Sequence, residues 1–199
     1  MCVHQALIET GAKYRLVLVD LKAGQQRDPE YLKLNPTGVV PTLLIDDAAF
    51  GEAASLLMTL ATRHPEARLI PAEDSLARAA WHQWIVYLAN TLQPAFRLWF
   101  YPTDISNDTN AQAILNGALR DKIERIWARI DTHLSAQGPY LLGAEFSAAD
   151  LLLIMLMRWA RKMPKPATDW QALNEYATRM KARPSWKQLY ALEGLTEWV

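Results

Sequence analysis

The chain has 199 residues and a mass of 22.6 kDa, enough for one large domain or two small ones. Its 21 Lys and Arg balance its 21 Asp and Glu, so it lacks the basic surface that a nucleic-acid partner requires. The longest apolar run, "LLLIMLM" at 151–157, is far shorter than the roughly 20 residues that cross a bilayer. The single cysteine, Cys2, forms no internal disulfide, and the N-terminus resembles no signal peptide, which favours a cytoplasmic protein.

Residues 1–64 mix strand and helix patterns. "YRLVLVD" at 14–20 is apolar on both faces, which predicts a buried parallel strand, and "TLLID" at 42–46 predicts another. Short helical patterns lie between them. We therefore expect an α/β domain over 1–64, followed by a linker at 65–74, where "PEARLIPAED" contains two prolines and no periodicity.

Residues 75–199 are predicted to be all-helical. From Ser75 to Tyr101, apolar side chains recur at spacings of three and four, which predicts one long helix with a kink at Pro94. A second helix is expected over 111–136, because its apolar periodicity ends just before Gly138. Two more helices are expected at 169–182 and 185–192. The domain should therefore be all-α.

"FSAADLLL" at 146–153 carries a complete helix start. Ser147 is placed as the N-cap, and Asp150 three residues later can return a bond to the backbone of the cap. Phe146 is placed to pack against Leu151 as a hydrophobic staple. Capping accounts for both Ser147 and Asp150, so we assign them a structural role and no catalytic one.

The order of these parts, with several local motifs, resembles the glutathione S-transferase superfamily, in particular its bacterial, beta-like members. "NPTGVVPTL" is similar to the family segment N-P-x-G-x-V-P-x-L, and "GEAASLLMTLATRHPEA" to the segment that follows. "FSAADLLL", "MRWARKM" and "RPSWKQLYALEGL" resemble later parts of the family. The resemblance implies a thioredoxin-like N-terminal domain followed by an all-helical C-terminal domain.

The resemblance also implies a glutathione site and no metal. The proline that corresponds to Pro41 is cis in the family, which turns the backbone N–H and C=O of Val40 toward an extended peptide, glutathione. Glu52 matches the acidic residue that receives the γ-glutamyl end; the alternative is a first-turn acid that only complements the helix dipole. Ala53 stands where the family usually has a Ser or Thr, so only the backbone there would bind. The four histidines are scattered and show no metal-ligand spacing.

Two departures from the family affect the predicted chemistry. "MCVHQALIETG" matches only the helical part of the first family segment, so the first strand and the catalytic loop after it are expected to be missing. In the family, that loop carries the Tyr, Ser or Cys that holds the glutathione thiolate, so the catalytic residue of this chain is unknown. Cys2 does not match the family's catalytic cysteine, because it aligns within the helix and not within the loop before it. The absence of the first strand would also leave two strand edges unpaired.

The second departure is on the long helix. Val86 and Gln93 stand where beta-class members often have an Asn and a His.

An electrophile pocket is expected between the two domains. Its predicted lining is Gln93, Phe96, Phe100, Tyr101 and Trp159. Aromatic side chains at helical spacing also pack in cores, so this alternative stays open.

The resemblance implies a homodimer that conjugates glutathione to a small apolar electrophile. Thiol isomerase, peroxidase and dehalogenase chemistry would use the same site, and a non-catalytic binding or docking protein of the same fold is the alternative.

Overall fold

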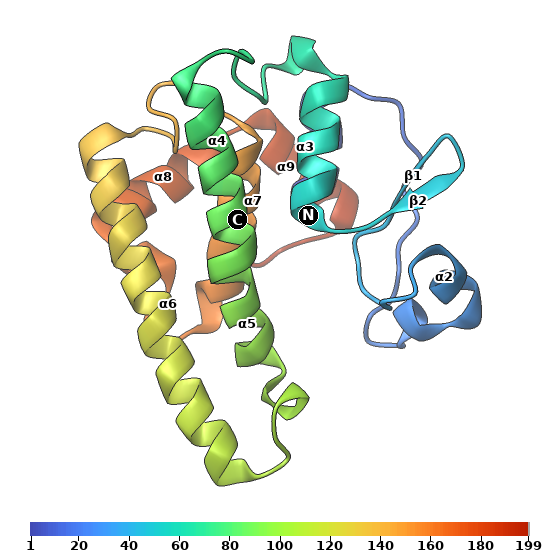
Figure 1. Cartoon of the computed structure of the whole chain (residues 1–199), viewed down its shortest axis with the longest axis vertical. Helices are drawn as coiled ribbons and strands as arrows, with labels where there is room; N and C mark the ends of the chain where they lie inside the picture. Colours follow the sequence, from blue (N-terminus) through green and yellow to red (C-terminus); the bar gives the residue numbers. More distant parts are fainter. Residues whose placement is uncertain (199) are drawn as a thin grey trace.

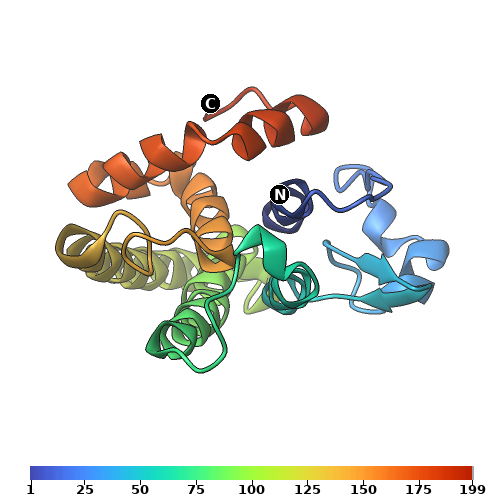
Figure 2. The same cartoon turned by 90° about the horizontal axis from the view of Figure 1, so that it is seen from above.

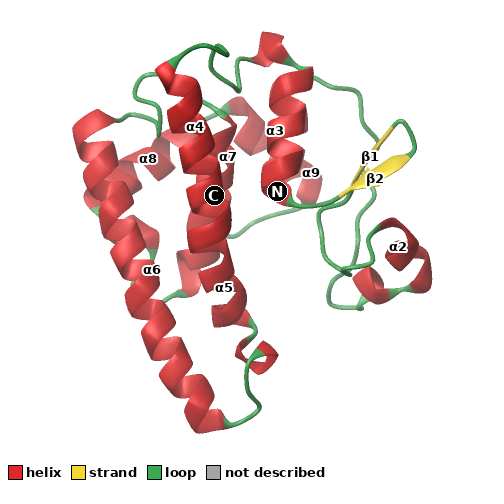
Figure 3. Ribbon diagram, in the orientation of Figure 1, coloured by secondary structure: helices red, strands yellow, loops and turns green. Residues whose placement is uncertain are grey.

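The computed structural model describes residues 1–198, and the chain is mainly helical (Figures 1 and 3). The N-terminal part holds α1 (Cys2–Thr10), α2 (Pro29–Leu34), β1 (Leu43–Ile45), β2 (Ala48–Phe50) and α3 (Ala53–Arg63). The C-terminal part holds α4 (Leu76–Tyr87), α5 (Gln93–Phe100), α6 (Thr109–Gln137), α7 (Ala148–Trp159), α8 (Gln171–Lys181) and α9 (Pro184–Glu193). This arrangement is the predicted fold class, a small thioredoxin-like domain followed by a helical one.

The two strands form an antiparallel hairpin at one side of the molecule (Figure 1). Leu43 pairs with Phe50 and Ile45 with Ala48, which confirms the strand predicted from "TLLID". Asp46 and Asp47 connect the strands with φ angles of 51° and 65°. Two positive φ angles in a two-residue turn match the right-handed twist of a hairpin, and Asp is one of the few residues that tolerate them.

The strand predicted at 14–20 is not formed within residues 1–198, where the described sheet contains β1 and β2 only. This segment is extended but has no ladder partner, and Leu16, Val17 and Leu18 are 42%, 66% and 71% exposed. The prediction of a buried parallel strand was therefore wrong. The physical reason is that a strand needs a neighbouring edge for its N–H and C=O groups, and the described part of the chain supplies none here.

One hydrophobic core joins the two parts. Helix α1 packs against α3, α7 and α9. Seen from above, α7 lies between α4 and α6 on one side and α8 and α9 on the other (Figure 2). Every residue of α7 from Ala148 to Met157 is buried. The predicted linker is also anchored, because Leu69 is fully buried and its carbonyl oxygen accepts the N–H of Ala148 at 2.9 Å.

The predicted helices are present with small changes of boundary. The long helix expected over 75–101 is divided into α4, a π-helical segment at Leu88–Leu92, and α5, so the break comes just before Pro94. Helix α6 ends before Gly138 as expected.

The helix start at α7 contains the expected capping box. Asp150 Oδ2 accepts the N–H of Ser147 at 2.9 Å and its hydroxyl at 3.0 Å. Asp150 Oδ1 accepts the N–H of Leu141 at 3.0 Å and the hydroxyl of Tyr176 at 3.2 Å. Burial raises the pKa of Asp150 from 3.8 to about 6, although these hydrogen bonds oppose the rise. The cap therefore also ties α7 to the loop before it and to α8.

Candidate functional site

A cavity of about 1410 Å³ lies between the N-terminal part, including α3, and the helices α5 and α7 of the C-terminal part. It brings together side chains from five separate segments of the chain. Most of the residues predicted for the glutathione site and the electrophile pocket line it: Val40, Pro41, Glu52, Ala53, Gln93, Phe100, Tyr101 and Trp159. The two sets of predicted residues therefore share one continuous space.

The first wall of the cavity is the loop that ends at Pro41. The Val40–Pro41 peptide bond is cis, and Val40 is 40% exposed. The loop is fixed from behind, because Val39 O accepts the hydroxyl of Tyr31 at 2.7 Å and the side-chain amide of Asn35 at 2.8 Å. With the preceding carbonyl held in this way, the backbone of Val40 is presented at the cavity as an edge to which an extended peptide can bind.

The second wall is the start of α3. Glu52 is the N-cap residue and Ala53 the first helical residue. The N-terminal N–H groups of a helix lack intrahelical partners, so this end of α3 favours an anion. Glu52 has φ 61° and ψ 104°, a backbone conformation that a residue with a side chain rarely adopts. Its side chain is exposed at the cavity, where a carboxylate can bind an ammonium group.

The third wall is aromatic. Phe100 and Trp159 meet edge to face with ring centroids 6.1 Å apart, and Tyr101 follows at the end of α5. Phe96 differs from the other predicted pocket residues: it is fully buried and lies outside the cavity lining. Its ring stacks on Phe100 at 5.9 Å and contacts Trp159 at 6.0 Å. Phe96 therefore supports the aromatic wall from within the core.

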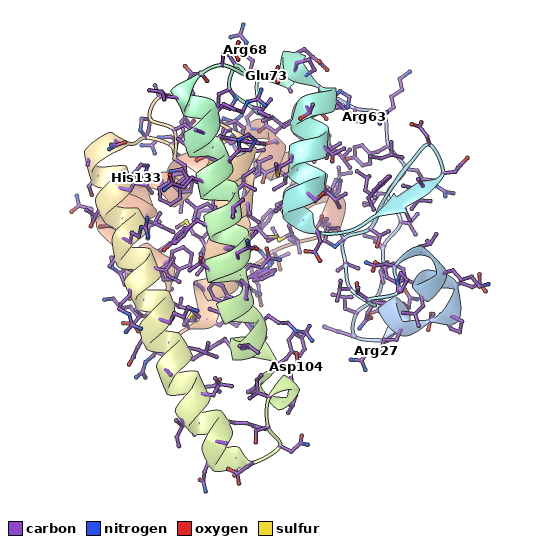
Figure 4. The ribbon with its side chains drawn as sticks, viewed as in Figure 1. Arg27, Arg63, Arg68, Glu73, Asp104 and His133 are labelled. Carbon is purple, nitrogen blue, oxygen red and sulfur yellow. The ribbon has the colours of Figure 1, made fainter. Side chains whose placement is uncertain are left out.

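Several polar residues of the cavity were not indicated by the sequence patterns. Arg97 lines it from α5, with its guanidinium 4.2 Å above the ring of Tyr101. Arg97 also forms an ion pair with Asp104 at 2.7 Å. Asp104 lies just beyond the end of α5 (Figure 4). Asn90 lines the cavity from the π-helical segment. The apolar periodicity of this segment gives no indication of these polar residues. Spacing does indicate Arg97, because it lies four residues from both Gln93 and Tyr101 and therefore shares their helix face.

Val86, the other position compared with the beta class, is 49% exposed on α4 and lies outside the cavity lining. Gln93 does line the cavity. These two positions are therefore separated, and only Gln93 can contact a ligand there.

Cys2 and His4 lie in the core on α1, outside the cavity lining. Burial raises the pKa of the Cys2 thiol, so it is protonated at neutral pH and unsuited to act as a nucleophile. His4 is hydrogen-bonded to Glu193 and to Tyr14, each at 2.8 Å, which fixes it between α1, α9 and the extended segment. Within residues 1–198, no three His, Cys, Asp or Glu side chains are grouped to hold a metal ion. Of the described helices, none combines the length and apolar character needed to span a bilayer.

Known proteins resemble this chain in both sequence and structure. Residues 1–68 match the family model for the N-terminal domain of glutathione S-transferase, and residues 108–191 match that for the C-terminal domain. Glutathione S-transferase GST-4.5 of Xanthomonas campestris is 31% identical over 92% of this chain and 88% of its own. GstA of Escherichia coli O157:H7 is 28% identical over 96% of this chain and 92% of its own.

Solved structures give the same result. A glutathione transferase homologue from Sulfitobacter has a TM-score of 0.89 and 26% identity, covering 98% of this chain and 93% of its own. The glutathione S-transferase of Xylella fastidiosa has a TM-score of 0.88 and 29% identity, covering 98% of this chain and 94% of its own. The chain belongs to the glutathione S-transferase family.

Proposed function

We propose that the protein binds glutathione in this cavity and conjugates it to a small apolar electrophile. The observation that carries the proposal is the continuity of the cavity. It joins the exposed backbone edge at Val40, the N-terminus of α3 with the acid Glu52, and the aromatic wall of Phe100 and Trp159. A tripeptide with two carboxylates and one ammonium group fits the first two walls, and an apolar molecule fits the third.

The chemistry follows from placing the two molecules side by side. The glutathione thiol loses its proton to solvent, and its sulfur then attacks the electrophilic carbon. A carbon–sulfur bond forms, and the leaving group departs with the electron pair of its broken bond. The protein contributes by orienting the two reactants and by favouring the thiolate at neutral pH. The resemblance assigns no residue of this sequence to the thiolate, so the proposal rests on binding and orientation.

Relatives support glutathione as the co-substrate. The Sulfitobacter homologue was solved with bound glutathione, and so was a sphingomonad glutathione S-transferase with a TM-score of 0.83 and 29% identity. By the same family membership, we propose a homodimer in the cytoplasm. Sedimentation of the purified protein would measure its oligomeric state, and fractionation of its native cells would show its compartment.

A non-catalytic glutathione-binding protein is the second candidate. Two observations favour it: Ala53 offers no hydroxyl at the start of α3, and Gln93 cannot act as an acid or a base in the cavity. Titration calorimetry with glutathione and a turnover assay with an aryl chloride separate the candidates. Binding with turnover supports the transferase, whereas binding without turnover supports the second candidate. If glutathione does not bind, both proposals are wrong.

A further inference from the structure

The helix along the cavity wall contains a π-turn. Between α4 and α5, the N–H of Gln93 donates to the carbonyl oxygen of Leu88, five residues earlier. In a regular α-helix it would donate to Ala89, four residues earlier. Single π-turns within α-helices are uncommon and often lie at functional sites. This turn lies in the wall of the cavity described above.

Pro94 removes the next backbone N–H donor of the helix. A proline has no N–H, so residue 94 donates neither to Asn90, four residues earlier, nor to Ala89, five residues earlier. The Ala89 oxygen has then lost both of these donors, whereas the Asn90 oxygen can still accept the N–H of Ala95, five residues later. Backbone carbonyls are strong acceptors that need a partner. The combination of π-turn and proline therefore leaves one main-chain acceptor, the Ala89 oxygen, without a helical donor.

This acceptor lies on the face that borders the cavity. Ala89, Asn90, Gln93 and Pro94 all line it. Because helix carbonyls point toward the C-terminal end, the Ala89 oxygen lies on the strip between Ala89 and Gln93. A ligand against this strip can donate to the Ala89 oxygen, which in a regular helix would accept the N–H of Gln93.

We propose that the Ala89 carbonyl group selects electrophiles that carry a neutral hydrogen-bond donor, an amide N–H or a hydroxyl, on an aromatic body. This inference rests on the proposed transferase function and names its substrate class. The donor is neutral because its acceptor is an uncharged carbonyl group, and the acid that lines the same cavity, Glu52, is assigned above to the ammonium group of glutathione. The aromatic body fits Phe100 and Trp159. An analogue without the donor buries the Ala89 carbonyl group without a hydrogen-bond partner, which lowers the affinity of that analogue.

A matched pair of probes tests the inference. The first is 4-chloro-3,5-dinitrobenzamide, and the second is its N,N-dimethyl analogue, which keeps the carbonyl but has no N–H. With each probe, the glutathione sulfur bonds to the carbon that carries chlorine, and chloride leaves with the electron pair. The preformed glutathione conjugates serve as ligands in titration calorimetry, so the measurement does not depend on turnover. We expect the primary amide conjugate to bind about fivefold more tightly than the dimethyl conjugate, the worth of one neutral hydrogen bond.

Pro94→Ala supplies the missing N–H and should reduce this preference to nearly one. Pro184→Ala is the matched control, because Pro184 is the first residue of α9, where an N–H has no intrahelical acceptor. The control should keep the fivefold preference. The mono-N-methyl conjugate retains one N–H and should bind close to the primary amide in the native protein, a test that needs no variant.

Two results would overturn the inference. One is equal affinity of the primary amide and dimethyl conjugates for the native protein. The other is a preference that persists in a folded Pro94→Ala variant. In either case, binding of glutathione itself would leave the proposed function standing. Loss of glutathione binding by the native protein would instead reject the proposed function, and the inference with it.

Discussion

The helical part and the hairpin part of the molecule bury their apolar side chains to different extents. In α7, every residue from Ala148 to Met157 is buried, whereas Leu16, Val17 and Leu18 of the extended segment are largely exposed. A helix satisfies its backbone hydrogen bonds internally, so its apolar face needs only another apolar surface. A strand needs the edge of a second strand as well. The same apolar composition therefore leads to burial in one part and exposure in the other.

The cavity lies where these two parts meet, and it depends on both. Helices α3, α5 and α7 belong to the common core and hold Ala53, Phe100 and Trp159 in place. The loop at Val40 belongs to the hairpin part and is held mainly by the side chains of Tyr31 and Asn35. The aromatic wall should therefore withstand local unfolding better than the peptide-binding edge.

The largest loss of stability is expected from Asp150→Ala in the helical part. The change leaves the N–H groups of Leu141 and Ser147 and the hydroxyl of Tyr176 without their buried acceptor. We expect the free energy of unfolding to fall by about 4 kcal/mol. Urea titration would measure it. Ser147→Ala is the control and should cost about 1 kcal/mol. Similar losses for the two variants would show that the carboxylate does not organise the cap.

A pair of identical substitutions tests the comparison of the two parts directly. Leu153→Ala empties a fully buried site in α7 and should lower the free energy of unfolding by about 3 kcal/mol. Leu18→Ala removes a side chain that is 71% exposed and should change it by less than about 0.5 kcal/mol. Thermal and urea unfolding of the two variants would measure both. A large loss for Leu18→Ala would mean that the extended segment is buried in solution, for instance by a second copy of the chain.

The pH dependence of stability gives a third test within the helical part. The pKa of Asp150 is about 6 in the folded protein, above its ordinary value of 3.8. Between these values the folded protein keeps a proton that the unfolded chain has lost. The protonated Asp150 therefore contributes up to about 3 kcal/mol to the free energy of unfolding. This contribution is fully present below pH 3.8 and is lost as the pH rises through 6.

The measurement compares unfolding in urea at several pH values from 4.5 to 7 for the native protein and Asp150→Asn. The difference in slope isolates Asp150, since the other carboxyl groups titrate in both proteins. We expect native stability to fall relative to the variant as the pH rises. Parallel curves would show that the pKa of Asp150 is close to its ordinary value.

Much of the fold was predictable because helix patterns are local. Spacings of three and four placed α4 to α9, and Ser147 with Asp150 marked the start of α7. The strand expected at 14–20 failed because pairing depends on a distant edge, which the apolar pattern of the segment itself does not report. In the site, periodicity placed Phe96 and Phe100 on one stripe but could not separate a core ring from a lining ring. Pro94 predicted the break in the long helix, but not the π-turn that leaves the Ala89 oxygen without a helical donor.

Ala53→Ser should strengthen the peptide-binding side of the cavity. Ala53 begins α3 and lines the cavity, so a hydroxyl there adds a donor beside the free N–H groups of the helix. A hydrogen bond to a charged group contributes roughly 1.5–3 kcal/mol, so glutathione should bind at least about tenfold more tightly. Titration calorimetry would measure the change. Ser55→Ala, at another lining position of α3, is the control and should have a smaller effect. Unchanged affinity for Ala53→Ser would place the glutathione carboxylate elsewhere.

The only gain in stability is expected from Glu52→Gly. Glycine adopts the positive φ of residue 52 without the cost of a side chain, so the free energy of unfolding should rise by about 1 kcal/mol. The same change removes the carboxylate from the cavity and should weaken glutathione binding. Glu52→Gln separates the two effects, because it keeps the backbone conformation and removes only the charge. If Glu52→Gln binds glutathione as well as the native protein does, Glu52 serves the dipole of α3 and the ammonium group binds elsewhere in the cavity.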